Sequence, residues 1–255
     1  MILRVAPLEH EAVRHAFFTR AGGVSEGVFA SLNCSLGSGD DPAKVAENRR
    51  RALAVLGLGP ERLVTTYQVH GAAVALVEAP WRHEDRPRAD ALVTRVPGIA
   101  LGILTADCAP VLFADPAARI VGAAHAGWRG ALGGVLEAAV AAMEREGALR
   151  ARIRAGVGPC IGGASYEVGP EFPAPFLAER ADNAGFFVAA SRPGHFLFDL
   201  GAYVEAKLRR LGLGAVARSG GDTCAEAARF FSWRRTCLDG QRQFGHLLSA
   251  ICLAP

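Results

Sequence analysis

Paired cysteines are absent from this 255-residue chain. The six cysteines stand singly, with no Cys-x-x-Cys pair among them, at positions 34, 108, 160, 224, 237 and 252. Structural zinc ribbons need such pairs, so the spacing excludes that class of site. A disulfide framework is not expected either, because a chain of this length can bury a sufficient core without covalent cross-links. Burial as a small apolar side chain is therefore the default interpretation for each cysteine.

Long apolar segments and a strong charge imbalance are also lacking. The formal net charge is +3, and basic residues are not concentrated in any segment, so no nucleic-acid footprint is predicted. The longest apolar run, residues 97–106, is about half as long as a membrane span. The N-terminal residues lack the charged and apolar regions of a signal peptide. We therefore expect a cytoplasmic protein that binds small molecules, with no nucleic-acid or membrane partner.

Several cofactor motifs are missing as well. The glycines at 156, 158 and 162 do not have the spacing of the dinucleotide-binding fingerprint, and no Gly-Lys-Ser/Thr phosphate loop occurs. The zinc nucleobase deaminase signature is absent, because Cys160 has no second cysteine three residues on and no His-x-Glu occurs. Cys160 itself either lines a pocket or packs in the core.

What the sequence does contain is three short strand-like segments that each lead to a residue able to bind a metal. Residues 63–69 precede His70, residues 99–105 lead to Cys108, and residues 120–124 precede His125. Strand ends that meet in a sheet can bring distant residues to one point. We therefore expect these three side chains to converge.

Two imidazoles and a thiolate suit a catalytic zinc ion, which takes three protein ligands and keeps a fourth position for water or substrate. A zinc ion in such a site lowers the pKa of water toward neutrality. Two other interpretations remain open. Cys108 and His125 could form a nucleophile and base without metal, and all three residues could simply pack in the core.

Charged residues near these positions have weaker patterns. Asp107 would point to the opposite face of a continued strand from Cys108, so we expect it to be a structural hydrogen-bonding group. Arg129 follows His125 and could neutralise an anion at the rim. Arg49 lies on a predicted helix and could hold phosphate, although a solvated helix face explains it as well.

The remaining elements predict one domain of α+β type over residues 1–255, with mixed sheets. Asp41 is a suitable N-cap, and Pro42 suits the first position of a helix. We expect helices over residues 42–56, 131–146 and 199–211, a turn at 127–130, and strands over residues 15–19, 230–233 and 247–253.

Seven short motifs span nearly the whole chain. They are His15-Ala16-Phe17-Phe18-Thr19-Arg20-x-Gly22-Gly23-Val24-Ser25, Glu47-Asn48-Arg49-Arg50, Gln68-Val69-His70-Gly71, Thr105-Ala106-Asp107-Cys108, Ala124-His125-Ala126-Gly127-Trp128-Arg129-Gly130, Gly158-Pro159-Cys160-Ile161-Gly162 and Phe231-Ser232-Trp233-Arg234-Arg235. In content and order they resemble the YfiH-type laccase-domain family, whose members are also described as multicopper polyphenol oxidoreductase-like proteins or purine nucleoside phosphorylases. The resemblance implies a layered α/β/β/α fold with two mixed sheets. It also places the family's metal ligands on His70, Cys108 and His125, and a basic residue near the substrate on Arg49.

The resemblance further implies phosphorolysis of adenosine, inosine and methylthioadenosine at a His/Cys/His zinc site, with adenosine deamination as a side activity. The residues expected to act catalytically are His70, Cys108, His125 and, as a proton shuttle in deamination, Asp107. Those expected to contact the nucleoside or phosphate are Arg49, Arg129 and Cys160. One departure from the family pattern is Phe244-Gly245-His246, where an aromatic-Gly-Arg is more usual.

Three alternatives stay open, one of which is a binding module without catalytic activity. A cysteine-dependent amidase or editing hydrolase for peptidoglycan precursors would use Cys108 as nucleophile and His125 as base. A polyphenol oxidoreductase with a single copper would use the same three ligands, whereas multicopper chemistry is not expected, because the seven histidines include no His-x-His pair. Zinc is favoured over copper, since only Met1 and Met143 could supply a thioether ligand.

Overall fold

The computed structural model describes residues 2–254, which form two large mixed β-sheets and a small third sheet. The five-stranded sheet has the order β1 (Ile2–Leu3), β2 (Val13–Phe18), β14 (Leu247–Leu253), β6 (Ala100–Thr105) and β3 (Leu63–Val64). The six-stranded sheet has the order β13 (Ala215–Arg218), β9 (Arg154–Val157), β7 (Ala109–Asp115), β8 (Ile120–Ala126), β5 (Ala91–Thr94) and β4 (Val74–Leu76). The small sheet consists of β10 (Glu167–Val168), β12 (Phe196–Phe198) and β11 (Phe187–Ala189).

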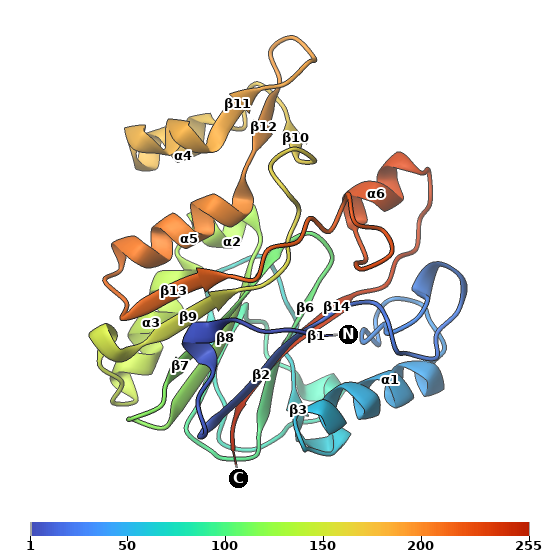
Figure 1. Cartoon of the computed structure of the whole chain (residues 1–255), viewed down its shortest axis with the longest axis vertical. Helices are drawn as coiled ribbons and strands as arrows, with labels where there is room; N and C mark the ends of the chain where they lie inside the picture. Colours follow the sequence, from blue (N-terminus) through green and yellow to red (C-terminus); the bar gives the residue numbers. More distant parts are fainter. Residues whose placement is uncertain (1, 255) are drawn as a thin grey trace.

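The helices lie outside the two large sheets. They are α1 (Pro42–Val55), α2 (Trp128–Leu132), α3 (Val135–Arg145), α4 (Ala174–Glu179), α5 (Leu200–Arg210) and α6 (Trp233–Leu238). Figure 1 places α1 on one side of the molecule and α3 and α5 on the other, while α4 and the small sheet project beyond the layers. This confirms the expected α/β/β/α arrangement and adds a third sheet to it. Within residues 2–254 no helix combines the length and apolarity needed to cross a membrane.

Alternating side chains on the central strands build the layers. Along β7, Val111 and Phe113 pack in the core shared with α3 and α5, whereas Leu112 and Ala114 pack in the core between the two large sheets. Successive side chains of a strand point to opposite faces of the sheet. A strand covered on both faces therefore has apolar side chains on both faces. On the far side, Ala52 and Leu53 of α1 cover the five-stranded sheet.

The ends of β3, β6 and β8 and the start of β7 lie at the same end of the two large sheets. β3 and β6 are parallel, so both end there. The chain then passes from β6 in one sheet to β7 in the other, and β8, antiparallel to β7, ends at the same edge. The segments that follow or end these strands contain His70, Cys108 and His125.

Two of the three predicted helices and two strands are confirmed. The Asp41 side chain accepts a hydrogen bond from the Ala43 amide at the start of α1, and Asp199 caps α5 in the same way. The strands expected at 15–19 and 247–253 are β2 and β14.

Four sequence predictions are wrong in detail. Residues 230–233 are not a strand: Ser232 accepts a hydrogen bond from the Arg235 amide and starts α6. Residues 127–130 form the start of α2 rather than a free turn. The helix expected at 131–146 is two helices, because Gly134 between them has a left-handed φ of 92°. The strand expected at 63–69 ends at Val64.

Candidate metal centre

His70, Cys108 and His125 converge at one point, each from a different element. His70 lies in the loop between β3 and β4, Cys108 between β6 and β7, and His125 near the end of β8. One ligand atom of each lies within 4.8 Å of the other two. The Cys108 sulfur is 3.7 Å from His70 Nε2, and the two imidazole rings are 4.7 Å apart, edge to face. This donor set is of the kind that binds zinc, so the residues present fit a metal ion.

His125 is held by a buried carboxylate that the sequence analysis did not single out. His125 Nδ1 lies 2.9 Å from Asp90 Oδ1, and the Asp90 side chain is fully buried. A donor on Nδ1 leaves Nε2 of the ring free to bind a metal. Asp90 is followed by β5 and belongs to no spacing motif, so only its position beside a strand could have drawn attention to it.

Cys108 follows Asp107, whose side chain is held by residues from the C-terminal part of the chain. Asp107 has a left-handed φ of 94°, which is uncommon for a residue other than glycine. Its carboxylate accepts hydrogen bonds from Thr223 Oγ1 and from the Arg234 amide, both at 2.6 Å. Asp107 is thus anchored to the C-terminal part of the chain, as expected of a structural hydrogen-bonding group. Its expected role as a proton shuttle stays a prediction.

The thiol and the imidazole perturb each other. Burial opposes charge on Cys108, but the positive charge of His125 and hydrogen bonds from both histidines outweigh it, so the pKa of the thiol is lowered. Burial likewise disfavours charge on His125, but the Cys108 thiolate and Asp90 outweigh it and raise the imidazole pKa. Near neutral pH the metal-free site is therefore a thiolate beside an imidazolium.

The three residues line a cleft of about 580 Å³. The other side chains and backbone around it are Ser35, Gly37, Thr66, Tyr67, Gln68, Arg86, Leu104, Thr105, Ala106, Trp233, Phe244 and His246. Thr66 Oγ1, Thr105 Oγ1 and His246 Nδ1 are buried there and have no hydrogen-bond partner among residues 2–254. Buried polar atoms normally have a partner, so these three are available to a ligand.

His246 is neutral at physiological pH. Burial, with a smaller contribution from the charge of His125, lowers the pKa of its imidazole to about 4. Where the family more usually has a permanently charged arginine, this chain therefore presents an uncharged ring. Next to it, Phe244 packs against both His246 and Trp233, with ring centroids 4.7 and 5.0 Å apart.

Arg49 does not line this cleft, but it is largely buried and bonds to Cys34, whose neighbour Ser35 does line it. Its Nε donates to the Cys34 carbonyl at 2.8 Å, and its Nη2 is buried without a hydrogen-bond partner in the described chain. Burial lowers the pKa of the guanidinium, and the positive charge of Arg86 adds to this effect. The two arginines therefore lie near each other, and Arg86 lines the cleft directly.

None of the three residues expected to contact substrate, Arg49, Arg129 and Cys160, is among the residues that line the cleft. Arg129 is exposed on α2, with its guanidinium 4.7 Å from the Trp128 ring centre. Cys160 is buried in the core beside α5, and burial raises the pKa of its thiol to about 12. Their expected substrate contacts stay predictions.

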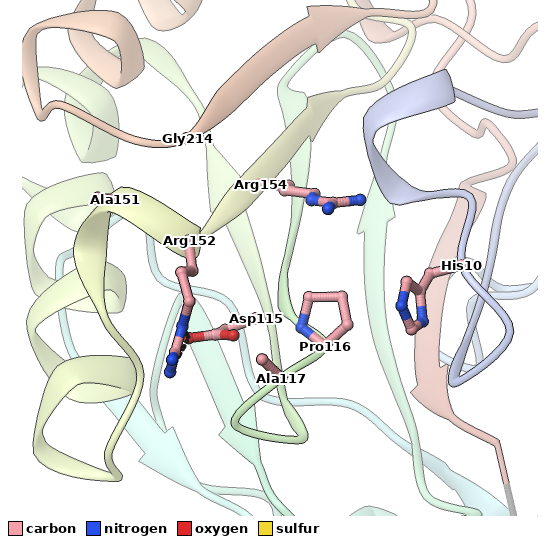
Figure 2. A pocket seen from close by; sticks show the side chains of 8 residues that line it. All are labelled: His10, Asp115, Pro116, Ala117, Ala151, Arg152, Arg154 and Gly214. Carbon is pink, nitrogen blue, oxygen red and sulfur yellow. Dashed lines mark hydrogen bonds and ion pairs between the residues drawn. The ribbon is translucent and has the colours of Figure 1, made fainter.

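A second cavity, of about 360 Å³, lies at the opposite end of β7 from Cys108 (Figure 2). Asp115 lies at its edge, where its carboxylate pairs with Arg152 at 3.1 Å. The same carboxylate also accepts hydrogen bonds from the amides of Ala118 and Leu149. Its oxygens are satisfied within the fold, and none of the residues predicted to be functional lines this cavity.

Comparison with known proteins gives consistent matches over nearly the whole chain. The sequence pattern of a family described as multi-copper polyphenol oxidoreductase laccase matches residues 14–254. A Deinococcus radiodurans protein named purine nucleoside phosphorylase is 46% identical over 224 residues, which are 88% of this chain and 84% of the relative. A Streptomyces coelicolor protein of the same name is 45% identical over 226 residues, 88% of this chain and 91% of the relative. The crystal structure of Bacillus licheniformis YfiH superposes with a TM-score of 0.87 at 30% identity, covering 94% of this chain and 92% of that one.

Proposed function

The chain belongs to the multi-copper polyphenol oxidoreductase laccase family, of which YfiH is a structural relative, and we propose that it is a purine nucleoside phosphorylase acting on adenosine, inosine and methylthioadenosine. The observation that carries the proposal is the cleft. It combines a His/Cys/His ligand set with Arg86, an aromatic pair and unpartnered polar groups. The names of the relatives support the same activity. We take residues 1–255 as one catalytic domain.

His70, Cys108 and His125 would hold the metal, and we propose that it is zinc. A thiolate with two imidazoles suits zinc better than magnesium or calcium, which prefer oxygen ligands. When bound, zinc supplies a positive charge that polarises oxygen atoms of substrate or water. Copper is less suitable, because the Met143 thioether, on α3, is packed in the core and is not available as an axial ligand.

The arginines would bind phosphate. Arg86 lines the cleft, and Arg49 has a buried Nη2 without a partner in residues 2–254, so a phosphate oxygen would satisfy it. Guanidinium groups hold phosphate through paired, charge-assisted hydrogen bonds. Phosphate oriented in this way would attack C1′ of the ribose as the base leaves.

The remaining groups of the cleft suit a nucleoside. Trp233 and Phe244 offer aromatic faces on which a purine can stack. The free atoms of Thr66, Thr105 and His246 are uncharged hydrogen-bonding groups, which match ribose hydroxyls or a purine edge. Adenosine deamination would use the same bound nucleoside. We do not assign its proton transfer to Asp107, whose carboxylate oxygens already accept two hydrogen bonds.

One specific observation favours a second function. The lowered pKa of Cys108 beside a raised pKa of His125 is also the pattern of a nucleophilic cysteine with its base. A cysteine-dependent amidase or editing hydrolase acting on peptidoglycan precursors is therefore the competing proposal. It differs from the first in needing no metal.

The decisive experiment measures metal content together with phosphate-dependent release of base from adenosine and inosine, before and after chelation. We expect about one zinc per chain for this ligand set, and loss of turnover on chelation and in Cys108→Ala. Cys237→Ala is the matched control, because Cys237 is exposed on α6, away from the metal ligands. A metal-free protein with Cys108-dependent hydrolysis of amides would contradict the phosphorylase proposal.

A further inference from the structure

Asp90 contacts the segments of both proposed histidine ligands. It lies immediately before β5 and is fully buried. One of its oxygens, Oδ1, is 2.9 Å from His125 Nδ1 and also accepts a hydrogen bond from the His70 amide at 2.9 Å. The other, Oδ2, accepts from the Gly71 amide at 2.8 Å and the Val69 amide at 3.1 Å. A single carboxylate thus joins the His70 loop to the His125 ring.

The contacts with the loop explain its conformation. Three successive amides, of Val69, His70 and Gly71, point at one carboxylate and form a small anion-binding concavity. His70 has a left-handed φ of 59°, which is unfavourable for a residue with a β-carbon and persists only where its surroundings hold it. Asp90 provides that support, because without it the three amides would lose their shared acceptor.

The contact with His125 acts on the ring rather than the backbone. Nδ1 faces the carboxylate, so Nε2 faces the ligand set, and the ring cannot turn over without breaking this hydrogen bond. The backbone adds a second restraint, since the His125 amide donates to the Asp90 carbonyl at 2.7 Å. Asp90 therefore restrains the backbone of His70 and the ring of His125 at the same time.

We propose that Asp90 is a positioning residue that sets the spacing of His70 and His125 before the metal arrives, so that the ion binds a preformed site. The inference rests on the metal site of the proposed function, but not on phosphorolysis. A structural role limited to stabilising the fold would make a different prediction, because it would leave the affinity of the folded protein for metal unchanged.

The first test is Asp90→Asn, which keeps the size of the side chain but turns one acceptor into a donor facing N–H groups. We expect the affinity of the folded, metal-free protein for zinc to fall about 10- to 100-fold, as is usual when a partner of a metal ligand is lost. Zinc itself is the probe, in competition with a chromogenic chelator. Asp90→Glu, which restores the charge but shifts its position, should recover only part of the affinity.

Asp115→Asn is the matched control. Asp115 is equally buried and accepts hydrogen bonds from two amides and an arginine, but it lies at the far end of β7 (Figure 2). It should lower the temperature of unfolding without changing zinc affinity. Equal zinc affinity in Asp90→Asn and the wild type would overturn the inference.

A second measurement needs no variant and holds even if Asp90→Asn does not fold. If Asp90 organises the loop in advance, the amides of Val69, His70 and Gly71 exchange slowly with solvent in the metal-free wild type. Exchange at the rate of an unstructured peptide would refute preorganisation. Neither assay contains a nucleoside. A wild type that binds zinc but does not cleave nucleosides would therefore overturn the proposed function alone.

Discussion

Gly127 offers a way to disturb the proposed metal centre without removing any of its proposed ligands. It is the N-cap of α2, and its φ of −65° and ψ of 163° are accessible to alanine, so Gly127→Ala introduces no backbone strain. A β-carbon at this position would lie 2.8 Å from Cys108 Sγ and 2.9 Å from His70 Cδ2. Two of the three proposed ligands would therefore have to move.

The size of the effect follows from these distances. Non-bonded heavy atoms of this kind normally approach to about 3.5–4.0 Å, so the two side chains must move by about 0.6–1.2 Å. Metal sites tolerate deviations of only about 0.2 Å in their ligand distances. Inserting one carbon into a packed site typically costs about 1–3 kcal/mol, which corresponds to about 5- to 150-fold weaker zinc binding. His70 is exposed and can relax, so the strain falls mainly on metal binding.

The assay is competition for zinc between the folded, metal-free variant and a chelator. Measuring affinity on folded protein separates the collision from any loss of stability at the N-cap of α2. Gly37→Ala is the control, because Gly37 lines the same cleft but a β-carbon there would have nothing closer than Ser35 Oγ at 4.0 Å. Wild-type zinc affinity in Gly127→Ala would show that these side chains do not bind the metal together.

Three further results are expected. Arg49→Lys should raise KM for phosphate about tenfold or more, since lysine keeps the charge but lacks the paired N–H donors of the guanidinium. An unchanged KM would exclude Arg49 from the phosphate site. At pH 7.5, zinc binding should release about one proton, from His125, because its pKa is raised above that pH while Cys108 is already ionised. Calorimetry in buffers of different ionisation enthalpy measures this, and two protons would contradict the thiolate–imidazolium pair. His246→Arg should lower KM for phosphate about tenfold, because it replaces a neutral side chain of the cleft with a charged hydrogen-bond donor. Steady-state kinetics with varied phosphate measure this, and an unchanged KM would show that His246 lies away from the phosphate.

The convergence of the three side chains could be predicted in part from strand ends, which leave a local signal in the sequence, whereas their assignment as metal ligands depended on the family resemblance. Cys108 and His125 lie at strand ends that the antiparallel pairing of β7 and β8 brings together. His70 instead lies in the loop beyond β3, which ends at Val64. Asp90 could not be found in this way. Its partners are 19 to 35 residues away along the chain, and no spacing rule connects a carboxylate before one strand to a loop and to another strand.

The wrong secondary-structure predictions have a related cause. In these segments, contacts with residues distant in the sequence determine the conformation rather than local composition. Residues 65–69 have the composition of a strand, yet the chain leaves the sheet after Val64. There the Gln68 side chain, rather than a backbone, bonds to the amide and carbonyl of Leu104, at 3.0 and 2.8 Å. Phe230 and Phe231 are apolar because they pack with Leu247 in a small cluster, not because they belong to a sheet. Their apolar character suits either a buried strand or a buried loop, so it does not determine the secondary structure.

Metal occupancy decides between the two chemistries proposed for Cys108. As a nucleophile, the thiolate must be free and His125 must accept a proton. As metal ligands, both residues use those same atoms for coordination, so a bound ion removes the nucleophile and its base together. The two activities therefore belong to two states of one site rather than to one mixed mechanism. If Asp90 positions both histidines as proposed, it would favour the metal-bound state, because its hydrogen bond leaves His125 Nε2 facing Cys108 and His70. A cysteine–histidine pair alone would not require the His70 loop to be held in a left-handed conformation.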